Sequence, residues 1–190
     1  MQIMDLSLCN VLALWWLMAK YPHGMCIGRD NRTMSEQLDG FDLKILAELQ
    51  RDGRLTNIEL SERISLSASQ CSRRRTRLEA EGFIRGYQAN LDPDRLGLNL
   101  LVVISVTLAT HNRDNARRFQ QLVNGLPEVL EAYALTGEMD YHLKVATRGL
   151  SGLSRFVNDV LLPHESVQHV KTSIVLNTLK HFEGYPLSGS

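Results

Sequence analysis

Four arginines lie close together in one short stretch of the chain, at Arg73, Arg74, Arg75 and Arg77. Guanidinium groups bind DNA phosphates and pair with guanine edges, so such a cluster could bind duplex DNA. Ser67 and Gln70 precede the cluster at capping-box spacing, and Gly82 follows it as a helix stop. The spacing therefore predicts a short capped helix of the kind that reads the major groove. The alternative is an ordinary helix with a solvated, charged face.

Seven residues of this predicted helix are candidates for DNA contact. Small polar side chains at its start would let the backbone approach the bases, whereas the arginines would reach phosphates or guanines. Gln70 has two competing uses, as a cap of the helix and as a partner for adenine. The candidates are Ser67, Ser69, Gln70, Ser72, Arg73, Arg74 and Arg77.

A second candidate site is the stretch TGEMDY, which begins at Thr136. Gly137 could expose backbone amides to a carboxylate, and Asp140 could pair with an ammonium group, which are the two charged groups of an amino acid. Thr172 and Ser173 on a later predicted strand are weaker additions. The alternative is a plain hairpin turn, in which Gly and Asp serve the backbone geometry.

The sequence carries no catalytic or metal-binding motif, and we expect neither catalytic nor metal-ligating residues. H-E-x-x-H, G-x-S-x-G, P-loop and G-x-G-x-x-G patterns are all missing. An enzyme is nevertheless the alternative from a different class, because fold alone does not decide function. The histidines are His23, His111, His142, His164, His169 and His181.

The charge balance restricts where nucleic acid could bind. Lys and Arg together number 21, as do Asp and Glu, so the formal net charge is zero and a uniformly basic protein is excluded. Positive charge must therefore be local. The three cysteines, Cys9, Cys26 and Cys71, have no C-x-x-C spacing, which favours a reducing compartment. We therefore expect a cytoplasmic protein, which as a DNA-binding protein would be associated with the nucleoid.

Residues 1–33 differ from the rest of the chain. Leu6 to Ala19 is apolar and uncharged, yet at 14 residues it is shorter than the roughly 20 that a membrane span needs. No basic stretch precedes it, as a signal peptide requires. We predict that residues 1–33 are a non-native leader or extension and that the protein proper starts at Met34. A peripheral membrane anchor is the alternative, and mass spectrometry of the native N-terminus would decide.

Residues 34–97 are predicted to form a DNA-binding domain with its connector. Asp39 is a good N-cap for a first helix, and Thr56 with Glu59 forms a capping box for a second. A turn over residues 65–67 leads into the arginine-rich helix, which gives a helix-turn-helix order. The stretch 83–91 suggests a small wing hairpin.

Residues 98–187 are predicted to form a ferredoxin-like domain. Apolar periodicity and breakers give the order β-α-β-β-α-β, a four-stranded antiparallel sheet with two helices on one face. Alternate residues of the first strand are apolar on both faces, so we expect the open faces of two sheets to meet in a dimer. The predicted elements span 98–110, 114–126, 129–136, 141–147, 150–162 and 167–179.

From residue 34 to 187 the chain resembles the Lrp/AsnC family of transcription regulators. The resemblance rests on LDGFDLKILAELQRDGR (38–54), SASQCSRRRTRLEAEGFIRGY (67–87), LDPDRLG (91–97) and TGEMDYHLKV (136–145). It implies an α+β protein with an N-terminal winged helix-turn-helix and a C-terminal ferredoxin-like βαββαβ domain that binds an effector, usually an amino acid. It also implies dimers that associate further, often into octamers, with double-stranded DNA as partner and no membrane. An architectural DNA-binding protein with little effector control is the alternative.

Two residues depart from the family pattern. Arg75 stands on the inward face of its helix, where an aliphatic residue is usual, so either its stem is buried with the charge at the rim or the helix is rotated. Ser65 stands where glycine is frequent, so a left-handed backbone there would be strained.

Overall fold

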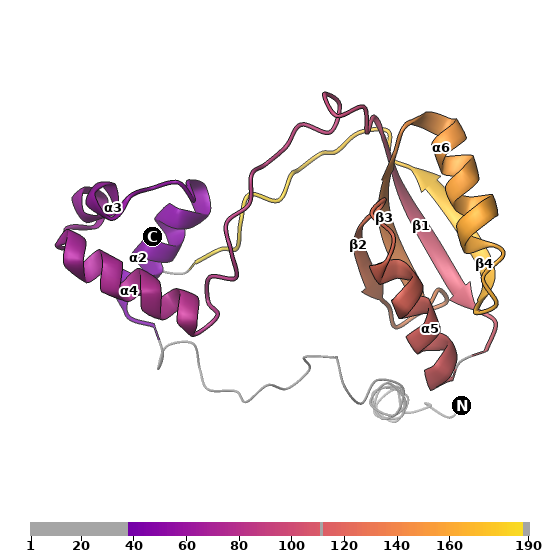
Figure 1. Ribbon diagram of the computed structural model, residues 1–190, viewed down its shortest axis with the longest axis horizontal. Helices are drawn as coiled ribbons and strands as arrows, with labels where there is room; N and C mark the ends of the chain where they lie inside the picture. Colours follow the sequence, from indigo (N-terminus) through magenta and orange to yellow (C-terminus); the bar gives the residue numbers. More distant parts are fainter. Residues whose placement is uncertain (1–37, 111, 188–190) are drawn as a thin grey trace, which may run out of the picture. The chain divides into compact units, whose positions relative to one another are not determined.

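The computed structural model describes residues 38–110 and 112–187 (Figure 1). The predicted leader, residues 1–33, lies outside this range. The described chain divides into two compact units. One contains residues 38–91 together with 179–187, and the other contains residues 92–178. Among the described residues, no helix is long and apolar enough to cross a membrane.

The first unit is built from three helices, α2 (Gly40–Arg51), α3 (Asn57–Ile64) and α4 (Ala68–Ala80). Each begins with a capping box, in which the N-cap side chain accepts the backbone N–H three residues on and that residue's side chain accepts the N-cap N–H. The predicted caps Asp39, Thr56 and Ser67 are thus confirmed. The helices pack around an apolar core of Leu38, Ile45, Leu49, Leu55, Leu60, Ile64, Cys71 and Leu78.

The turn between α3 and α4 has the left-handed backbone that the sequence suggested. Ser65 lies at φ 58° and ψ 45°, and it is the single non-glycine residue with positive φ in the described part of the chain. This conformation is sterically unfavourable for L-residues, so the backbone of the turn is locally strained. At the other end of α4, Gly82 takes φ 78° and the Ile84 N–H bonds the Leu78 carbonyl at 3.1 Å, which closes the helix as predicted.

The predicted wing hairpin is absent from residues 83–91, where the described backbone forms no strand. The segment instead runs as a single extended connector. Phe83 and Ile84 pack against the helical core, and Tyr87 bonds to side chains of α4. A hairpin needs two strands whose backbones bond to each other, and the backbone of residues 83–91 pairs with no other strand.

The second unit holds a four-stranded sheet in the predicted β-α-β-β-α-β order. Its strands are entirely antiparallel and lie side by side as β2-β3-β1-β4. The elements are β1 (Leu100–Leu108), α5 (Arg113–Asn124), β2 (Val129–Ala134), β3 (Tyr141–Thr147), α6 (Gly149–Arg155), the π-helical η2 (Phe156–Leu161) and β4 (Val167–Ile174). The strand β4 is shorter than predicted: its pairing with β1 ends at Ile174, opposite Val102, and one further bond joins the Val175 N–H to the Leu101 carbonyl.

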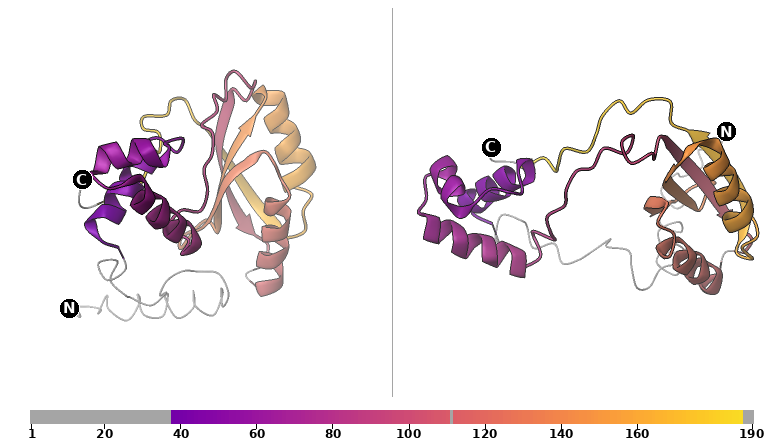
Figure 2. Two further views of the ribbon diagram at one scale, coloured as in Figure 1. Left: turned by 60° about the vertical axis from the view of Figure 1, so that its left-hand side comes forward. Right: turned by 45° about the horizontal axis from the view of Figure 1, so that its top comes forward.

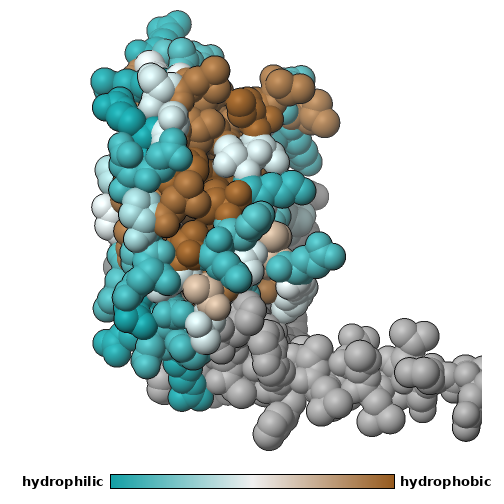
Figure 3. Space-filling model, turned by 90° about the vertical axis from the view of Figure 1, so that its right-hand side faces the viewer, coloured by the Kyte–Doolittle hydropathy of each residue, from teal (hydrophilic) through white to brown (hydrophobic). Residues whose placement is uncertain are grey.

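One face of this sheet is covered and the other is open. The even-numbered residues of β1, such as Ile104 and Val106, lie in a core with Phe119 of α5 and Phe156 of η2. Figure 2 shows both helices along the same face of the sheet. The odd-numbered residues of β1 are only half-buried. Figure 3 shows a further apolar band on the side of this unit that carries α6 and β4. Exposed apolar side chains are Leu150 of α6, Leu162 directly after η2, and Ile174 of β4.

Candidate nucleic-acid and ligand sites

The start of α4 is fixed by its own side chains. The Gln70 backbone N–H donates to the Ser67 hydroxyl at 3.3 Å, and the Gln70 side-chain oxygen accepts the Ser67 backbone N–H at 3.2 Å. The Ser69 hydroxyl lies 3.1 Å from that of Ser67. Gln70 is therefore engaged as a cap here, whereas Ser69 stands exposed at the tip of the helix.

Two of the predicted DNA-contacting arginines are instead paired with the start of α2. Arg74 Nη1 lies 2.8 Å from Asp42 Oδ1 and 2.7 Å from Asp39 Oδ2. Arg77 Nη2 lies 2.5 Å from Asp42 Oδ2. The Asp42 side chain is only 1% exposed, so each of its oxygens is matched by a guanidinium. A buried carboxylate without partners would be costly, which makes these arginines a means of holding α4 against α2.

The charge of Arg74 is reinforced by this pairing. Hydrogen bonds to Asp42 and Asp39 raise the pKa of Arg74 above its usual value, against the opposing effect of burial. Its side chain is also only 23% exposed and lies over the Phe41 ring, with 5.7 Å between the guanidinium carbon and the ring centroid. Arg74 is thus oriented toward α2 rather than toward solvent.

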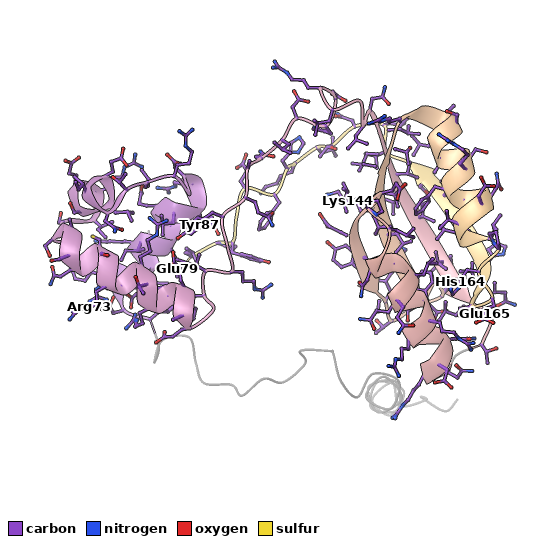
Figure 4. The ribbon with its side chains drawn as sticks, in the orientation of Figure 1. Arg73, Glu79, Tyr87, Lys144, His164 and Glu165 are labelled. Carbon is purple, nitrogen blue, oxygen red and sulfur yellow. The ribbon has the colours of Figure 1, made fainter. Side chains whose placement is uncertain are left out.

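Arg73 is the arginine of the cluster with an exposed side chain and no ion pair in the described chain. Figure 4 places it on the outer side of α4. Ser69 and Thr76 lie four and three residues from Arg73, and Ser72 lies three and four residues from Ser69 and Thr76, so the four side chains share one side of the helix. This small polar face with one guanidinium has the composition expected of a groove-facing surface.

Arg75 stands where the family usually has an aliphatic residue. Of the two arrangements expected for it, the structure has the one with the stem buried and the charge at the rim. Its Nη1 donates to the Leu55 carbonyl at 2.9 Å, and its Nε donates to the Tyr87 hydroxyl at 2.9 Å. The Tyr87 hydroxyl donates in turn to Glu79 at 2.8 Å, as Figure 4 allows the reader to follow. Burial and the bond to Glu79 raise the pKa of Tyr87.

Asp42 and Tyr87 are the structurally important residues that sequence reasoning missed. Asp42 stands three residues after the N-cap Asp39, which is the second position of a capping box and a signal that could have found it. Its pairing with α4 needs the tertiary fold, as does the contact of Tyr87 with Arg75.

The predicted effector loop connects β2 to β3. Thr136 and Gly137 lie exposed in it, and a side chain added at Gly137 would meet open space. Asp140 is buried, and its Oδ2 accepts the Leu108 N–H at 2.9 Å, which ties the loop to the end of β1. The carboxylate that we predicted to bind an ammonium thus also has a structural bond.

Thr172 and Ser173 lie on β4, two strands away from β3. Thr172 is opposite Ile104, whose side chain faces the helices, whereas Ser173 is opposite Val103 on the open face. Neighbouring residues of a strand point to opposite faces, so these two cannot line one site within a single sheet. Ser173 is the one that shares the open face.

No metal centre is formed by the described residues, since no group of three or more His, Cys, Asp or Glu side chains could hold an ion.

Comparison with known proteins agrees with this architecture. Residues 38–85 match the family of winged helix-turn-helix DNA-binding domains, and residues 101–185 match the Lrp/AsnC ligand-binding domain. Together with the capped helix-turn-helix and the ferredoxin-like sheet, these matches define a transcription regulator with a DNA-binding and a ligand-binding domain. The chain belongs to the Lrp/AsnC family.

Individual relatives cover most of the chain. The leucine-responsive regulatory protein of Escherichia coli (strain K12) is 38% identical over 145 residues, which are 76% of this chain and 88% of that protein. A transcriptional regulator from Neisseria meningitidis, solved in complex with L-Met, is 44% identical, with a TM-score of 0.77 over 80% of this chain and 97% of its own. An AsnC-family regulator from Agrobacterium tumefaciens is 30% identical, with a TM-score of 0.75 over 79% of this chain and 97% of its own.

Proposed function

We propose that this regulator binds operator DNA through the exposed polar face of α4 and changes its binding or assembly when an amino acid occupies the ferredoxin-like domain. The observation that supports DNA binding by this face is that the arginines of the cluster differ in their ion pairs. Asp42 holds Arg74 and Arg77, and this leaves Arg73 with Ser69 and Ser72 on the outer face.

The roles of the DNA-binding residues follow from their partners in the free protein. Arg73 and Ser69 are the first candidates for direct contact. Arg74 and Arg77 would reach phosphates only through guanidinium N–H groups that Asp42 does not use. Each guanidinium has five N–H donors, so some remain available. Ser67 and Gln70 cap the helix, so their N-terminal position near a phosphate would serve mainly to orient α4.

The effector is proposed to be an amino acid. The regulator from Neisseria meningitidis was solved with L-Met, and several relatives are leucine-responsive proteins, which supports this ligand class. The candidate loop offers the Gly137 backbone to a carboxylate, with Thr136 beside it and Asp140 as the acidic group. Ser173 remains a candidate on the open sheet face, and Thr172 would have to act from the other face.

Assembly is proposed to be a homodimer that associates further, up to an octamer, with the open sheet faces in contact. Two recognition helices would then bind roughly palindromic half-sites one or more helical turns apart. The chain would act without catalysis, in the cytoplasm and on the nucleoid.

Genome-wide mapping of bound sites, with and without added L-leucine or L-methionine, tests this function. We expect a defined set of operators whose occupancy changes with the amino acid. An occupancy pattern that is sequence-specific but unaffected by any amino acid would favour the architectural alternative. Binding that shows no preference over random duplex DNA would reject the regulator role itself.

A further inference from the structure

One tyrosine of the connector after α4 is held by the helical unit through both its ring and its hydroxyl. An added side-chain carbon at Gly53, in the turn between α2 and α3, would lie 3.0 Å from the Tyr87 ring. The Arg75 guanidinium lies over the same ring, with 4.8 Å between its carbon and the ring centroid. The Tyr87 hydroxyl accepts from Arg75 and donates to Glu79, which Figure 4 shows beside it. We call Gly53, Arg75, Glu79 and Tyr87 the Tyr87 cluster.

Arg75 joins this ring to the rest of the helical unit. Its side chain is 21% exposed, and besides the Tyr87 hydroxyl its guanidinium bonds the carbonyl of Leu55, a buried residue of the turn between α2 and α3. An aliphatic residue, which is usual in the family at this position, would pack against the core but would donate none of these bonds. The hydrogen-bonded cluster therefore depends on a residue at which this chain departs from the family pattern.

The Tyr87 cluster determines where the free part of the connector begins. Before Tyr87, the last backbone bond to the helices is the one from the Ile84 N–H to the Leu78 carbonyl. After it, residues 88–91 are exposed and make no hydrogen bond within the described chain. At about 3.3 Å for each residue, a link that starts after Tyr87 reaches roughly 13 Å, whereas one that starts after Ile84 would reach roughly 23 Å. The cluster thus shortens the free link by nearly half.

We propose that Tyr87 is a positioning residue, which fixes the start of the connector to the helical unit and thereby limits how far apart a dimer can place its two recognition helices. A short link restricts the distances that two joined modules can span, because reach grows with the number of free residues. The proposal rests on the proposed function, since it takes two half-sites bound by a dimer as given. It assigns this regulator a narrow range of half-site separations, set by the Tyr87 cluster.

Trypsin digestion of the free protein tests the cluster without DNA. Arg85 is an exposed residue between Ile84 and Tyr87, and trypsin cleaves after it only when the surrounding segment is free of the helical unit. In Arg75→Leu and Tyr87→Ala, the fragment that ends at Arg85 should appear about fivefold faster than in wild type, because charged hydrogen bonds that hold the segment are gone. Arg117→Leu, the same change at an exposed position of α5, should leave the rate unchanged.

Operators of altered spacing test the consequence for DNA binding. The half-sites of a mapped operator are moved apart in steps of one base pair, and the affinity is measured at each spacing. The ratio of affinities between the native operator and a lengthened one that wild type binds poorly should fall about fivefold in Arg75→Leu and Tyr87→Ala, since a longer free link reaches the displaced half-site. Arg75→Lys keeps the charge but not the planar fork, so it should match Arg75→Leu. The series is repeated with Gln50→Ala, which removes both bonds to the Tyr185 backbone and so frees the C-terminal segment as a second link.

The outcomes separate the cluster from the function. Tyr87→Phe keeps the ring beside Gly53 and loses only the hydroxyl bonds, so it should show a smaller increase in cleavage and serves where Tyr87→Ala does not fold. Wild-type cleavage rates in both Arg75→Leu and Tyr87→Phe would overturn the cluster. Faster cleavage with an unchanged spacing ratio would overturn the positioning role, as would a wild-type ratio in Arg75→Lys or a wild type that binds every spacing equally. A wild type that prefers no operator over random duplex DNA would reject the proposed function, while the cleavage rates would still test the cluster.

Discussion

At the scale of single residues, the buried carboxylate of Asp42 decides how the arginine cluster is used. It accepts from Arg74 and Arg77 on α4 and also from the Asp39 N–H on its own helix at 3.1 Å. Sequence patterns placed all these residues on helices, yet they could not show that two arginines turn inward, because the pairing depends on how α2 and α4 cross. The distinction between anchoring and exposed arginines is therefore a product of the tertiary fold.

Replacing Asp42 with Asn should destabilise the helical unit by about 2–4 kcal/mol, because it leaves two guanidinium groups without their buried counter-charge. Urea unfolding followed by circular dichroism measures this. Arg73→Ala, which removes an exposed side chain without an ion pair, is the control and should stay within about 0.5 kcal/mol of wild type. Equal stability of the Asp42→Asn and Arg73→Ala variants would show that the buried network contributes nothing.

At the scale of elements, the three helices of the first unit begin at the residues that local capping patterns predict. All three N-caps were predicted, two of them as complete capping boxes, because the groups of a cap lie within four residues of one another. The conformation of residues 83–91 could not be predicted in the same way, since a strand forms only where a neighbouring segment pairs with it. The end of β4 was also predicted too late, because the strand ends where its pairing with β1 ends, at Ile174, and sequence periodicity does not show that point.

The turn at Ser65 gives an element-scale prediction. Ser65→Gly should stabilise the helical unit by about 0.5–1 kcal/mol, since glycine takes the left-handed backbone without steric cost but loses more freedom on folding. Urea unfolding of the variant beside Ser67→Ala, which should lose about 1 kcal/mol through its cap, measures both directions in one series. A Ser65→Gly variant that is less stable than wild type would contradict the assignment of strain to this turn.

The carboxylates of the caps should make the helical unit sensitive to acid. Burial tends to raise the pKa of Asp39, but hydrogen bonds from the Asp42 amide and Arg74 outweigh it, so the pKa lies below its usual value. The bond from the Thr56 N–H lowers the pKa of Glu59. A depressed pKa contributes stability that is present above the unfolded pKa of about 4 and is lost as pH falls through the folded pKa.

The corresponding experiment compares urea unfolding at pH 7 and pH 3. Wild type should lose more stability than the double variant Asp39→Asn with Glu59→Gln, because the variant lacks the two cap carboxylates whose pKa is lowered in the folded state. Parallel losses in the two proteins would locate the acid sensitivity elsewhere.

At the scale of the whole molecule, the sheet of the ferredoxin-like unit has one open face. Lys144 and Glu131 pair across it at 2.9 Å, and Glu131 also accepts from the Tyr133 hydroxyl. Both bonds lower the pKa of Glu131. Around them lie the half-buried Leu101 and Val103 of β1, which leaves a mixed apolar and polar surface suited to a second copy.

Val103→Asp should convert the assembly to monomers, since it places a charge in the middle of this face. Light scattering coupled to size-exclusion chromatography measures the mass, and Gln121→Asp on the outside of α5 is the control with the same added charge. A Val103→Asp protein with the mass of wild type would show that the open face is not the contact.

DNA binding across a salt series tests the central claim, the outward role of Arg73, most directly. Affinity for a mapped operator should fall for Arg73→Ala, and the slope of log affinity against log salt should decrease by about one for each recognition helix bound, if the guanidinium contacts a phosphate. If it reads a base, preference at one position should relax by about 1–3 kcal/mol instead. Arg117→Ala should leave affinity, slope and preference unchanged. An Arg73→Ala protein that matches wild type in all three would contradict the account.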